Sequence, residues 1–426
     1  MTGLNDVDPK NVKFSILIAT PPKGAKLDPR DPGTWWAATA PRERGRIEIS
    51  AQMHDHCMVL AGVPAKAFYN DPEVNFKVGG AVAAYYGLDS PQAIGDVYNF
   101  EAEALGQPMI YGSHSMPTID FRDPLIKEPK DLDHLKAPEW LEKPRVRFSL
   151  DIIRLGAPLG CLGFFCAPFS LAVGLCSYPG LIRFIRRDPQ FAHAIFTKLV
   201  DEIQPSFLKA MKEYSGVDTA TGADAWAAYP NIPPEMADEW AVTYNMRLFQ
   251  NCLPFGMTAA GLAAADYCEE RLEKFDKNVL FKCFDVEVKT FFGLPVLLLG
   301  MGRWQDYPLE AVAEYLDRYK QQGIRAGVMA GINARMLRDG PVDRIVDNVK
   351  RYVKTLGRDH NLAIFLANIP ADTPPDHVHA AVAAAATYGR LPIVEDVDEV
   401  EFKMPQRESF QEFVAKMSGG AGLTLN

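Results

Sequence analysis

The feature that most constrains the fold is a regular alternation, after Arg145, of short apolar runs with long amphipathic segments. This alternation is typical of βα units, in which parallel strands buried on both faces are connected by helices. The pattern predicts helices over 181–214, 234–249, 309–322, 342–356 and 375–388. It predicts strands over 160–166, 217–223, 255–260, 279–284, 296–299, 327–332 and 363–366.

The number of predicted strands favours one fold over its main competitor. Seven strands, together with one expected near Tyr111, make the eight of a (β/α)8 barrel. A doubly wound sheet fits less well because the sequence has no GxGxxG or GxxxxGKS/T phosphate-binding loop. We therefore predict an α/β protein, a (β/α)8 TIM barrel over residues 100–400. The remaining parts are an N-terminal arm and helical elaboration over 1–150, with helices at 41–60 and 74–86, and a C-terminal tail over 401–426.

Composition and charge exclude several classes of protein. The chain of 426 residues is 48% hydrophobic and 23% charged, which provides apolar material for a large buried core. With 45 basic against 54 acidic residues the net charge is −9, and without a basic patch we expect no nucleic-acid partner. The seven cysteines form no CxxC pair and the sequence opens without a secretory signal pattern, so we expect a cytoplasmic protein.

One segment has the length and composition of a membrane span. Residues 155–182 carry no charged side chain, and a helix of that length would cross a bilayer. Prolines and glycines interrupt the segment, and its phenylalanines and leucines fall into two short blocks. A buried strand, a turn and the start of a helix account for it better, so we expect no membrane association.

Four segments, in order along the chain, carry a resemblance to a known family. Residues 165–172 read FCAPFSLA and resemble a Gly-Pro-Phe-Thr-Leu-Ala turn, and residues 222–224 end a strand in an acidic residue. Residues 331–341 read GINARMLRDGP and resemble a strand end followed by a Leu-x-x-Gly-Thr-Pro helix entry. Residues 369–378 read IPADTPPDHV and resemble an Ile-Pro-x-Asp-Thr-Pro-Pro-Glu-Asn-Val turn. Over about residues 100 to 390 the chain is thus similar to the uroporphyrinogen decarboxylase superfamily.

Departures from the family pattern bear on function. The Arg-Gln-Ala-Gly-Arg segment, whose arginines hold propionates in the decarboxylases, is missing, and so is the His-x-Cys zinc motif of the thiol-using methyltransferases. The resemblance therefore implies a corrinoid-dependent methyltransferase that moves a methyl group from a small O-methylated donor, an aromatic methyl ether, to the cobalamin of a corrinoid partner protein. Two alternatives stay open. One is a uroporphyrinogen decarboxylase-like lyase acting on another carboxylate, with Arg303 and Arg335 near strand ends, and the other is a protein that docks a corrinoid protein without chemistry.

Candidate catalytic and substrate-binding residues are those expected at the ends of strands. Asp224 follows an apolar strand, where a carboxyl could donate a proton if burial raised its pKa, and His114 follows an early strand and could act as an acid or base. A capping aspartate and a surface-loop histidine are the alternative interpretations. The residues expected to contact substrate are Trp226, Tyr229, Phe165, Cys166, Asn333 and Asn368.

Candidate metal ligands are weaker. Cys252, Cys268 and Cys283 could hold zinc together with an acidic residue, although buried cysteines are common as plain core residues. The run His54-Asp55-His56-Cys57 looks like a ligand cluster, but on a helix side chains two positions apart point to different sides. The same objection applies to His377 and His379.

Overall fold

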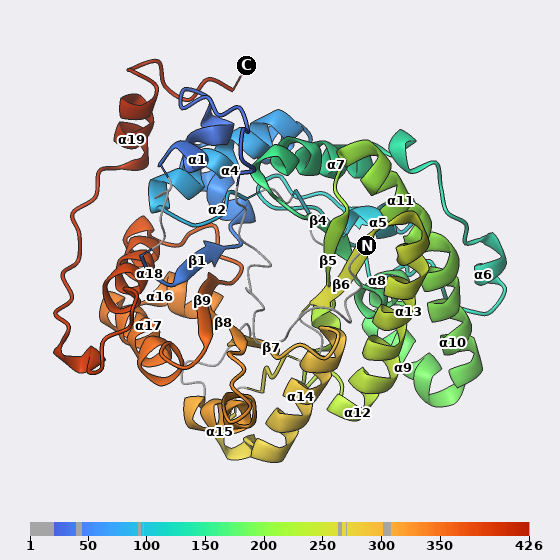
Figure 1. Ribbon diagram of the computed structural model, residues 1–426. Helices are drawn as coiled ribbons and strands as arrows, with labels where there is room; N and C mark the ends of the chain where they lie inside the picture. The colour runs from blue at the N-terminus through green and yellow to red at the C-terminus, as the bar shows by residue number, and fades with distance from the viewer. Residues whose placement is uncertain are drawn as a thin grey trace. The chain divides into compact units, whose positions relative to one another are not determined.

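The computed structural model describes residues 21–39, 45–92, 95–96, 98–262, 266–269, 271–300 and 308–425. Figure 1 shows an α/β protein in which short parallel strands alternate with helices. The chain divides into two compact units. We call Met1–Val63, Phe76–Gln92 and Asp266–Asn426 the terminal unit, and Pro64–Asn75 with Ala93–Ala265 the central unit.

The terminal unit contains a parallel sheet of four strands in the order β1-β9-β8-β7. β1 comes from the beginning of the chain, yet it pairs with β9 from near the end, as the blue and orange arrows in Figure 1 show. The apolar run of β7 is fully buried, and each such side chain contributes about 1.5–3 kcal/mol through its transfer from water. The strands are β1 (Glu48–Ala51), β7 (Val296–Leu299), β8 (Gly327–Ile332) and β9 (Asn361–Leu366).

The helices of the terminal unit follow the strands in the order that βα units require. They are α1 (Trp35–Thr39), α2 (His54–Ala61), α14 (Lys277–Thr290), α15 (Leu309–Lys320), α16 (Ala334–Asp339), α17 (Val342–Leu356), α18 (Pro375–Tyr388) and α19 (Phe410–Met417). A further helix, α4 (Pro72–Tyr86), has residues in both units.

The central unit contains a second parallel sheet, in the order β4-β5-β6. Its strands are β4 (Gly163–Cys166), β5 (Thr219–Ala223) and β6 (Thr258–Leu262). Glycine is required at Gly222 because a Cβ there would lie 2.4 Å from the ring of Phe165 on the neighbouring strand. A short antiparallel pair, β2 (Met109–Ile110) with β3 (Thr118–Ile119), lies outside this sheet.

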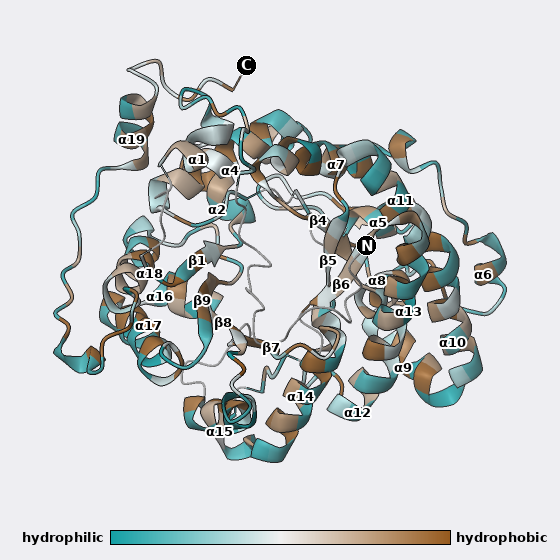
Figure 2. Ribbon diagram, viewed as in Figure 1, coloured by the Kyte–Doolittle hydropathy of each residue, from teal (hydrophilic) through white to brown (hydrophobic). Residues whose placement is uncertain are grey.

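Most helices of the central unit connect its parallel strands. Figure 2 shows that helices such as α10 and α13 carry both hydrophilic and hydrophobic residues, as expected for helices with one buried side. The helices are α3 (Ala65–Phe68), α5 (Phe100–Ala104), α6 (Asp131–His134), α7 (Pro144–Gly156), α8 (Pro168–Cys176), α9 (Tyr178–Arg187), α10 (Pro189–Lys198), α11 (Gln204–Ser215), α12 (Pro234–Ala237) and α13 (Thr243–Cys252).

Several sequence predictions agree with these elements and three do not. The strands at 296–299 and 327–332 and the helices at 342–356 and 375–388 are confirmed to the residue. The segment 279–284 is part of helix α14, so its prediction as a strand was wrong. The Asp276 carboxylate accepts the N–H of Asn278 at 2.8 Å and thereby caps this helix.

The other two errors concern the first part of the chain. The strand near Tyr111 is β2, which pairs antiparallel with β3 and belongs to neither parallel sheet. The helix predicted over 41–60 contains strand β1 followed by helix α2, and residues 41–44 lie outside the described residues. Residues 1–150 therefore contribute a strand of the terminal sheet as well as helices.

The uncharged segment at 155–182 forms strand β4, a turn and the fully buried helix α8, as predicted. Within the described part of the chain, no single helix is long and apolar enough to cross a membrane, and the pair α8 and α9 that passes this test together is bent by 103°.

Candidate active site

In parallel αβ folds the carboxyl ends of the strands are where binding and catalytic groups gather. In the central unit, buried titratable side chains gather at the end of β4. The Oε1 atom of Glu101 accepts the backbone N–H of Cys166, the last residue of β4, at 2.6 Å. The other oxygen, Oε2, is buried without a hydrogen-bond partner among the described residues. Burial raises the pKa of Glu101 to about 8, so this carboxyl keeps its proton at neutral pH.

No signal in the sequence marks Glu101 as a site residue. It lies in the short helix α5, in a run of alternating glutamate and alanine, and its burial comes from contacts with a strand 65 residues away. Only the aromatic residue before it, Phe100, indicates that one side of this helix is buried.

Asp224, the predicted catalytic acid, lies immediately after β5 and is fully buried. Its Oδ1 accepts the backbone N–H of Ser170 at 2.7 Å, and its Oδ2 accepts the Nδ2 of Asn245 at 2.8 Å. Burial raises the pKa of Asp224, while the hydrogen bonds from Asn245 and Ser170 oppose that rise. Both oxygens are therefore occupied in joining α8 and α13 to the strand end, and this geometry is that of a positioning residue.

The Cys166 side chain lies among these acids. Burial, followed by the charges of Glu101 and Asp224, raises the pKa of this thiol well above its ordinary value, so Cys166 stays protonated. Its carbonyl accepts the side-chain amide of Gln204 at 2.7 Å. Phe165 is also buried, with its ring over Gly222, so neither of these predicted substrate contacts is exposed.

Aromatic and apolar side chains lie near the same strand ends. Tyr98 and Met116, both half-buried, pack against Phe164 of β4 and Ala223 of β5. Burial raises the pKa of the Tyr98 hydroxyl, so this group keeps its proton.

The other aromatic residues predicted to contact substrate lie after Asp224. Trp226 is half-buried, stacks on Tyr178 at 5.6 Å between ring centroids and meets Phe121 edge-on at 6.1 Å. Tyr229 is half-buried as well. His114 is exposed in the segment that connects β2 to β3.

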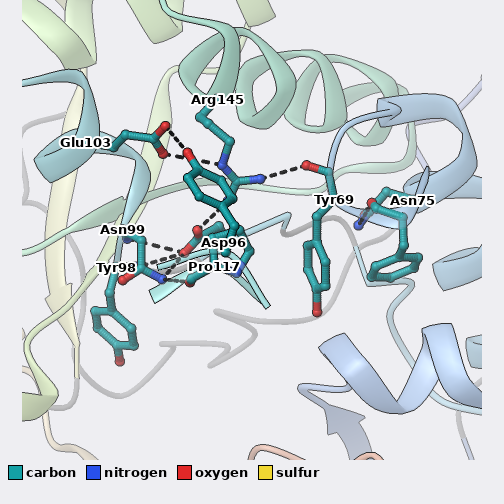
Figure 3. Close-up of polar contacts among 10 residues, drawn as sticks. Tyr69, Asn75, Asp96, Tyr98, Asn99, Glu103, Pro117 and Arg145 are labelled. Carbon is teal, nitrogen blue, oxygen red and sulfur yellow. Dashed lines mark hydrogen bonds and ion pairs between the residues drawn. The ribbon is translucent and has the colours of Figure 1, made fainter. Parts of the chain in front are cut away.

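A buried ion pair fixes the segment that leads to Glu101. An Arg145 Nη donates to Asp96 Oδ2 at 2.6 Å and the other Nη to the Tyr69 carbonyl at 2.7 Å. The Asp96 Oδ1 accepts the backbone N–H groups of Tyr98 and Asn99. Figure 3 shows this network, with the ring of Tyr98 extending away from the ion pair. The charge of Arg145 is thus neutralised within the protein.

The two asparagines predicted to bind ligand belong to the terminal unit. Asn333 follows β8 and caps α16, with its Oδ1 accepting the Met336 N–H at 2.9 Å. Asn368 follows β9, is exposed and has a φ of 46°, a left-handed conformation that asparagine tolerates. Both lie at strand ends as predicted, and their contact with a ligand stays a prediction.

The cysteines predicted as zinc ligands are divided between the two units. Cys252 ends α13 of the central unit, whereas Cys268 and Cys283 belong to the terminal unit. Across the described ranges no group of three or more His, Cys, Asp or Glu side chains is arranged to hold a metal ion. Burial raises the pKa of Cys252 to about 12, and the Cys268 thiol donates to Asp266 at 3.3 Å. The described residues therefore offer no ligand set that fits zinc, and no step is derived through it.

A second group of buried acids surrounds Cys268. The Oε2 atom of Glu287 accepts the N–H of Leu298, in the interior of β7, at 2.7 Å, and its Oε1 has no partner among the described residues. Burial raises the pKa of Asp266 to about 7 and that of Glu287 well above its ordinary value, and the charge of Asp266 raises the latter further.

Comparison with known proteins agrees with this architecture. Residues 48–255 match the family described as Uroporphyrinogen decarboxylase (URO-D), a segment that begins at β1 and ends just after α13. A solved structure, a methyltransferase from Methanosarcina mazei, is 16% identical over 85% of this chain and 99% of that chain, with a TM-score of 0.57. The fold is a (β/α)8 barrel. The predicted fold class of the barrel is thereby confirmed, and no curated protein sequence matches the chain.

Proposed function

We propose that this protein is a methyltransferase that moves a methyl group from a small O-methylated donor, an aromatic methyl ether, to the cobalamin of a corrinoid partner protein. The observation that carries the proposal is Glu101, a buried carboxyl that holds its proton at neutral pH and bonds to the end of β4, the strand on which Tyr98 and Met116 also pack. The URO-D match and the likeness to a structure named methyltransferase support the reaction class.

Breaking the methyl–oxygen bond of an ether leaves the bonding electron pair on the oxygen, which then needs a proton. The corrinoid supplies the nucleophile, a reduced cobalt whose electron pair forms the new bond to the methyl carbon. Glu101 supplies the proton. Since its Oε1 accepts the Cys166 N–H, the proton resides on the unpartnered Oε2. With a pKa of about 8, about nine-tenths of the Glu101 side chains carry this proton at pH 7.

The other residues at the strand ends position this acid and the ligand. Tyr98 and Met116 offer apolar surface to an aromatic ring, and Asp224 fixes the start of α8 through the Ser170 N–H. The Arg145–Asp96 pair holds the backbone of Tyr98, three residues before Glu101. In-line attack on a methyl group demands such fixed geometry, because small misplacements of the reacting groups are costly.

The alternative lyase reading would need cationic side chains that face a substrate carboxylate. The guanidinium of Arg145 is already paired with Asp96, and its side chain is only 7% exposed. Arg335 is exposed in α16, and Arg303 lies outside the described residues. The neutral acid at Glu101 therefore favours a reaction that consumes a proton at oxygen over one that binds several carboxylates.

The proposal is tested by mixing the purified chain with a reduced corrinoid protein and a panel of methoxylated aromatics, including 2-methoxyphenol. The absorbance change that accompanies methylation of the cobalamin is followed, and the demethylated product is identified by mass. We expect methylation with at least one donor, with release of the matching phenol. No absorbance change with any methyl donor would contradict the proposal, and binding of the corrinoid protein without turnover would favour the docking reading.

A further inference from the structure

A second polar site lies at the carboxyl end of β1, in the terminal unit. Beyond the strand, the Gln52 N–H donates to the Leu366 carbonyl at the end of β9, and the Gln52 carbonyl accepts the Ile369 N–H. His54 follows two residues later as the first residue of α2. It is 8% exposed, so this histidine is buried at the end of the sheet where ligands bind in barrels.

The backbone of His54 is strained. Its φ is 33°, in the left-handed region that a histidine adopts only at a cost. Gln92 holds it there, since the Gln92 Oε1 accepts the N–H of Met53 at 2.5 Å and that of His54 at 3.1 Å. Strain that neighbouring groups enforce in this way is found preferentially at functional sites.

The same glutamine fixes the tautomer of the imidazole. Because Oε1 of Gln92 already accepts two backbone N–H groups, its amide nitrogen must face the ring, and it lies 3.2 Å from Nδ1 of His54. Nδ1 is therefore the acceptor, and the proton of the neutral ring is on Nε2. Burial lowers the pKa of His54 to about 4, so the ring is neutral over the physiological range.

The Nε2–H group has no partner. Nε2 is buried without a hydrogen bond among the described residues, although the rest of the ring and the backbone on either side are held in place. Two residues further along α2, His56 is also buried and has its Nε2 bonded to the Tyr86 hydroxyl at 2.7 Å, while its Nδ1 has no partner among the described residues. Leaving a buried donor unpaired costs about 1–3 kcal/mol, so a site built to keep one is expected to use it.

We propose that His54 is a ligand-binding residue whose Nε2–H donates a hydrogen bond to an oxygen atom of the bound ligand. Gln92 is the residue that keeps the proton of the neutral ring on Nε2. The imidazole stays neutral and transfers no proton; it stabilises the negative charge that develops on the oxygen. The fixed Nε2–H donor does not depend on the proposed function, because it rests only on residues of the terminal unit.

The first test replaces His54 by glycine, which accepts a positive φ without strain. His54→Gly relieves the strain but also removes a buried ring and its bond to Gln92, so its melting temperature is measured alongside its binding. With 2-methoxyphenol as the probe, we expect weaker binding in calorimetry, because the ligand oxygen loses its hydrogen-bond donor. His56→Ala is the contrast: it removes the bond to Tyr86, so it should lower the melting temperature while leaving the affinity for 2-methoxyphenol unchanged.

The second test changes the tautomer. In Gln92→Glu a carboxylate replaces the amide nitrogen next to Nδ1, which draws the proton to Nδ1 and leaves Nε2 as an acceptor whenever the ring is neutral. The nitrogen spectrum of protein with 15N-labelled histidine reads this directly and needs no ligand. We expect a protonated Nε2 at His54 in the wild type and a protonated Nδ1 in Gln92→Glu, with weakened binding of 2-methoxyphenol that recovers at low pH, when both nitrogens carry protons.

These results separate the two proposals. If no donor is demethylated but 2-methoxyphenol binds in a His54-dependent way, the proposed function fails and the inference stands. If methyl transfer proceeds and His54→Gly leaves the affinity for 2-methoxyphenol unchanged, the inference alone is overturned. A wild-type spectrum with the proton on Nδ1, or no binding of 2-methoxyphenol to the wild type, would also overturn it.

Discussion

Two buried glutamates, one in each unit, each accept a backbone N–H from a strand, but at different places along that strand. Glu101 accepts the N–H of Cys166 at the carboxyl end of β4, and Glu287 accepts that of Leu298 inside β7. Each leaves one oxygen without a partner among the described residues, and burial raises the pKa of both. Chemically they are alike, so position along the strand is what distinguishes them. A protonated carboxyl at a strand end can reach a ligand, whereas one inside the sheet satisfies a backbone donor.

The largest effect that separates the two regions is on turnover. Glu101→Gln keeps an oxygen for the Cys166 N–H but cannot donate an acidic proton, so we expect kcat for methyl transfer to fall by about 10²–10⁴-fold. Glu287→Gln is the matched control and should change kcat by less than about twofold. Stopped-flow single turnovers measure the rate of methyl transfer in both variants. Equal losses of rate would contradict the different roles of Glu101 and Glu287.

The next effect is on stability and concerns the ion pair that holds the Glu101 segment. Arg145→Met leaves the Asp96 carboxylate buried without its cation, and we expect the free energy of unfolding to drop by about 3–5 kcal/mol. Arg122→Met breaks an ion pair with Asp120 whose arginine is 81% exposed, and it should leave the free energy of unfolding nearly unchanged. Urea unfolding of both variants checks this, and a small loss for Arg145→Met would mean that the network does not hold the segment.

Substitutions at Glu287 sharpen its structural role. Glu287→Leu removes the acceptor of a buried N–H, and we expect a destabilisation of about 1–3 kcal/mol. Glu287→Gln keeps the acceptor and removes the cost of holding a buried carboxyl in its protonated form at neutral pH, so its free energy of unfolding should be at or above that of the wild type. If Gln proved as harmful as Leu, the carboxyl proton of Glu287 would have a role that the hydrogen bond to Leu298 does not explain.

The remaining effect is a pH dependence of stability in both regions. The folded-state pKa values, about 8 for Glu101 and about 7 for Asp266, lie above their ordinary values of 4.5 and 3.8. The folded state thus binds protons that the unfolded state has lost, and the free energy of unfolding decreases as the pH rises from about 4 to 8. Urea unfolding at pH 5 and pH 8 should show a shallower decrease in Glu101→Gln and in Asp266→Asn, and a wild-type free energy that rises with pH would contradict the assignment.

The barrel strands could be predicted because strands buried on both faces consist of consecutive apolar residues. β7, β8 and α17 were found to the residue for this reason. The segment 279–284 was mispredicted as a strand because its apolar run was taken as the main signal. The buried residues of α14 have helical spacing and follow the capping Asp276, and this signal outweighs the apolar run; they include Leu280, Cys283, Phe284 and Glu287. β1 was missed because its four residues include a glutamate and a serine among few apolar ones.

The site was less predictable, because its chemistry depends on contacts between distant segments. The sequence placed Asp224 correctly at a strand end, but Ser170 and Asn245, which occupy its oxygens, come from helices far along the chain. Two properties distinguish Glu101 and the strained His54, namely their burial and a fixed atom without a partner among the described residues. Both properties arise only in the folded chain.

The central claim is that Glu101 donates its proton to the leaving oxygen, and the pH profile of single-turnover methyl transfer to the corrinoid protein tests it most directly. In the wild type and in Glu287→Gln the rate should be constant at neutral pH and fall about tenfold per unit above pH 8, as Glu101 loses its proton. In Glu101→Gln the rate should be low, without a break near pH 8. A profile in Glu101→Gln that still breaks near pH 8 at the wild-type rate would contradict the account.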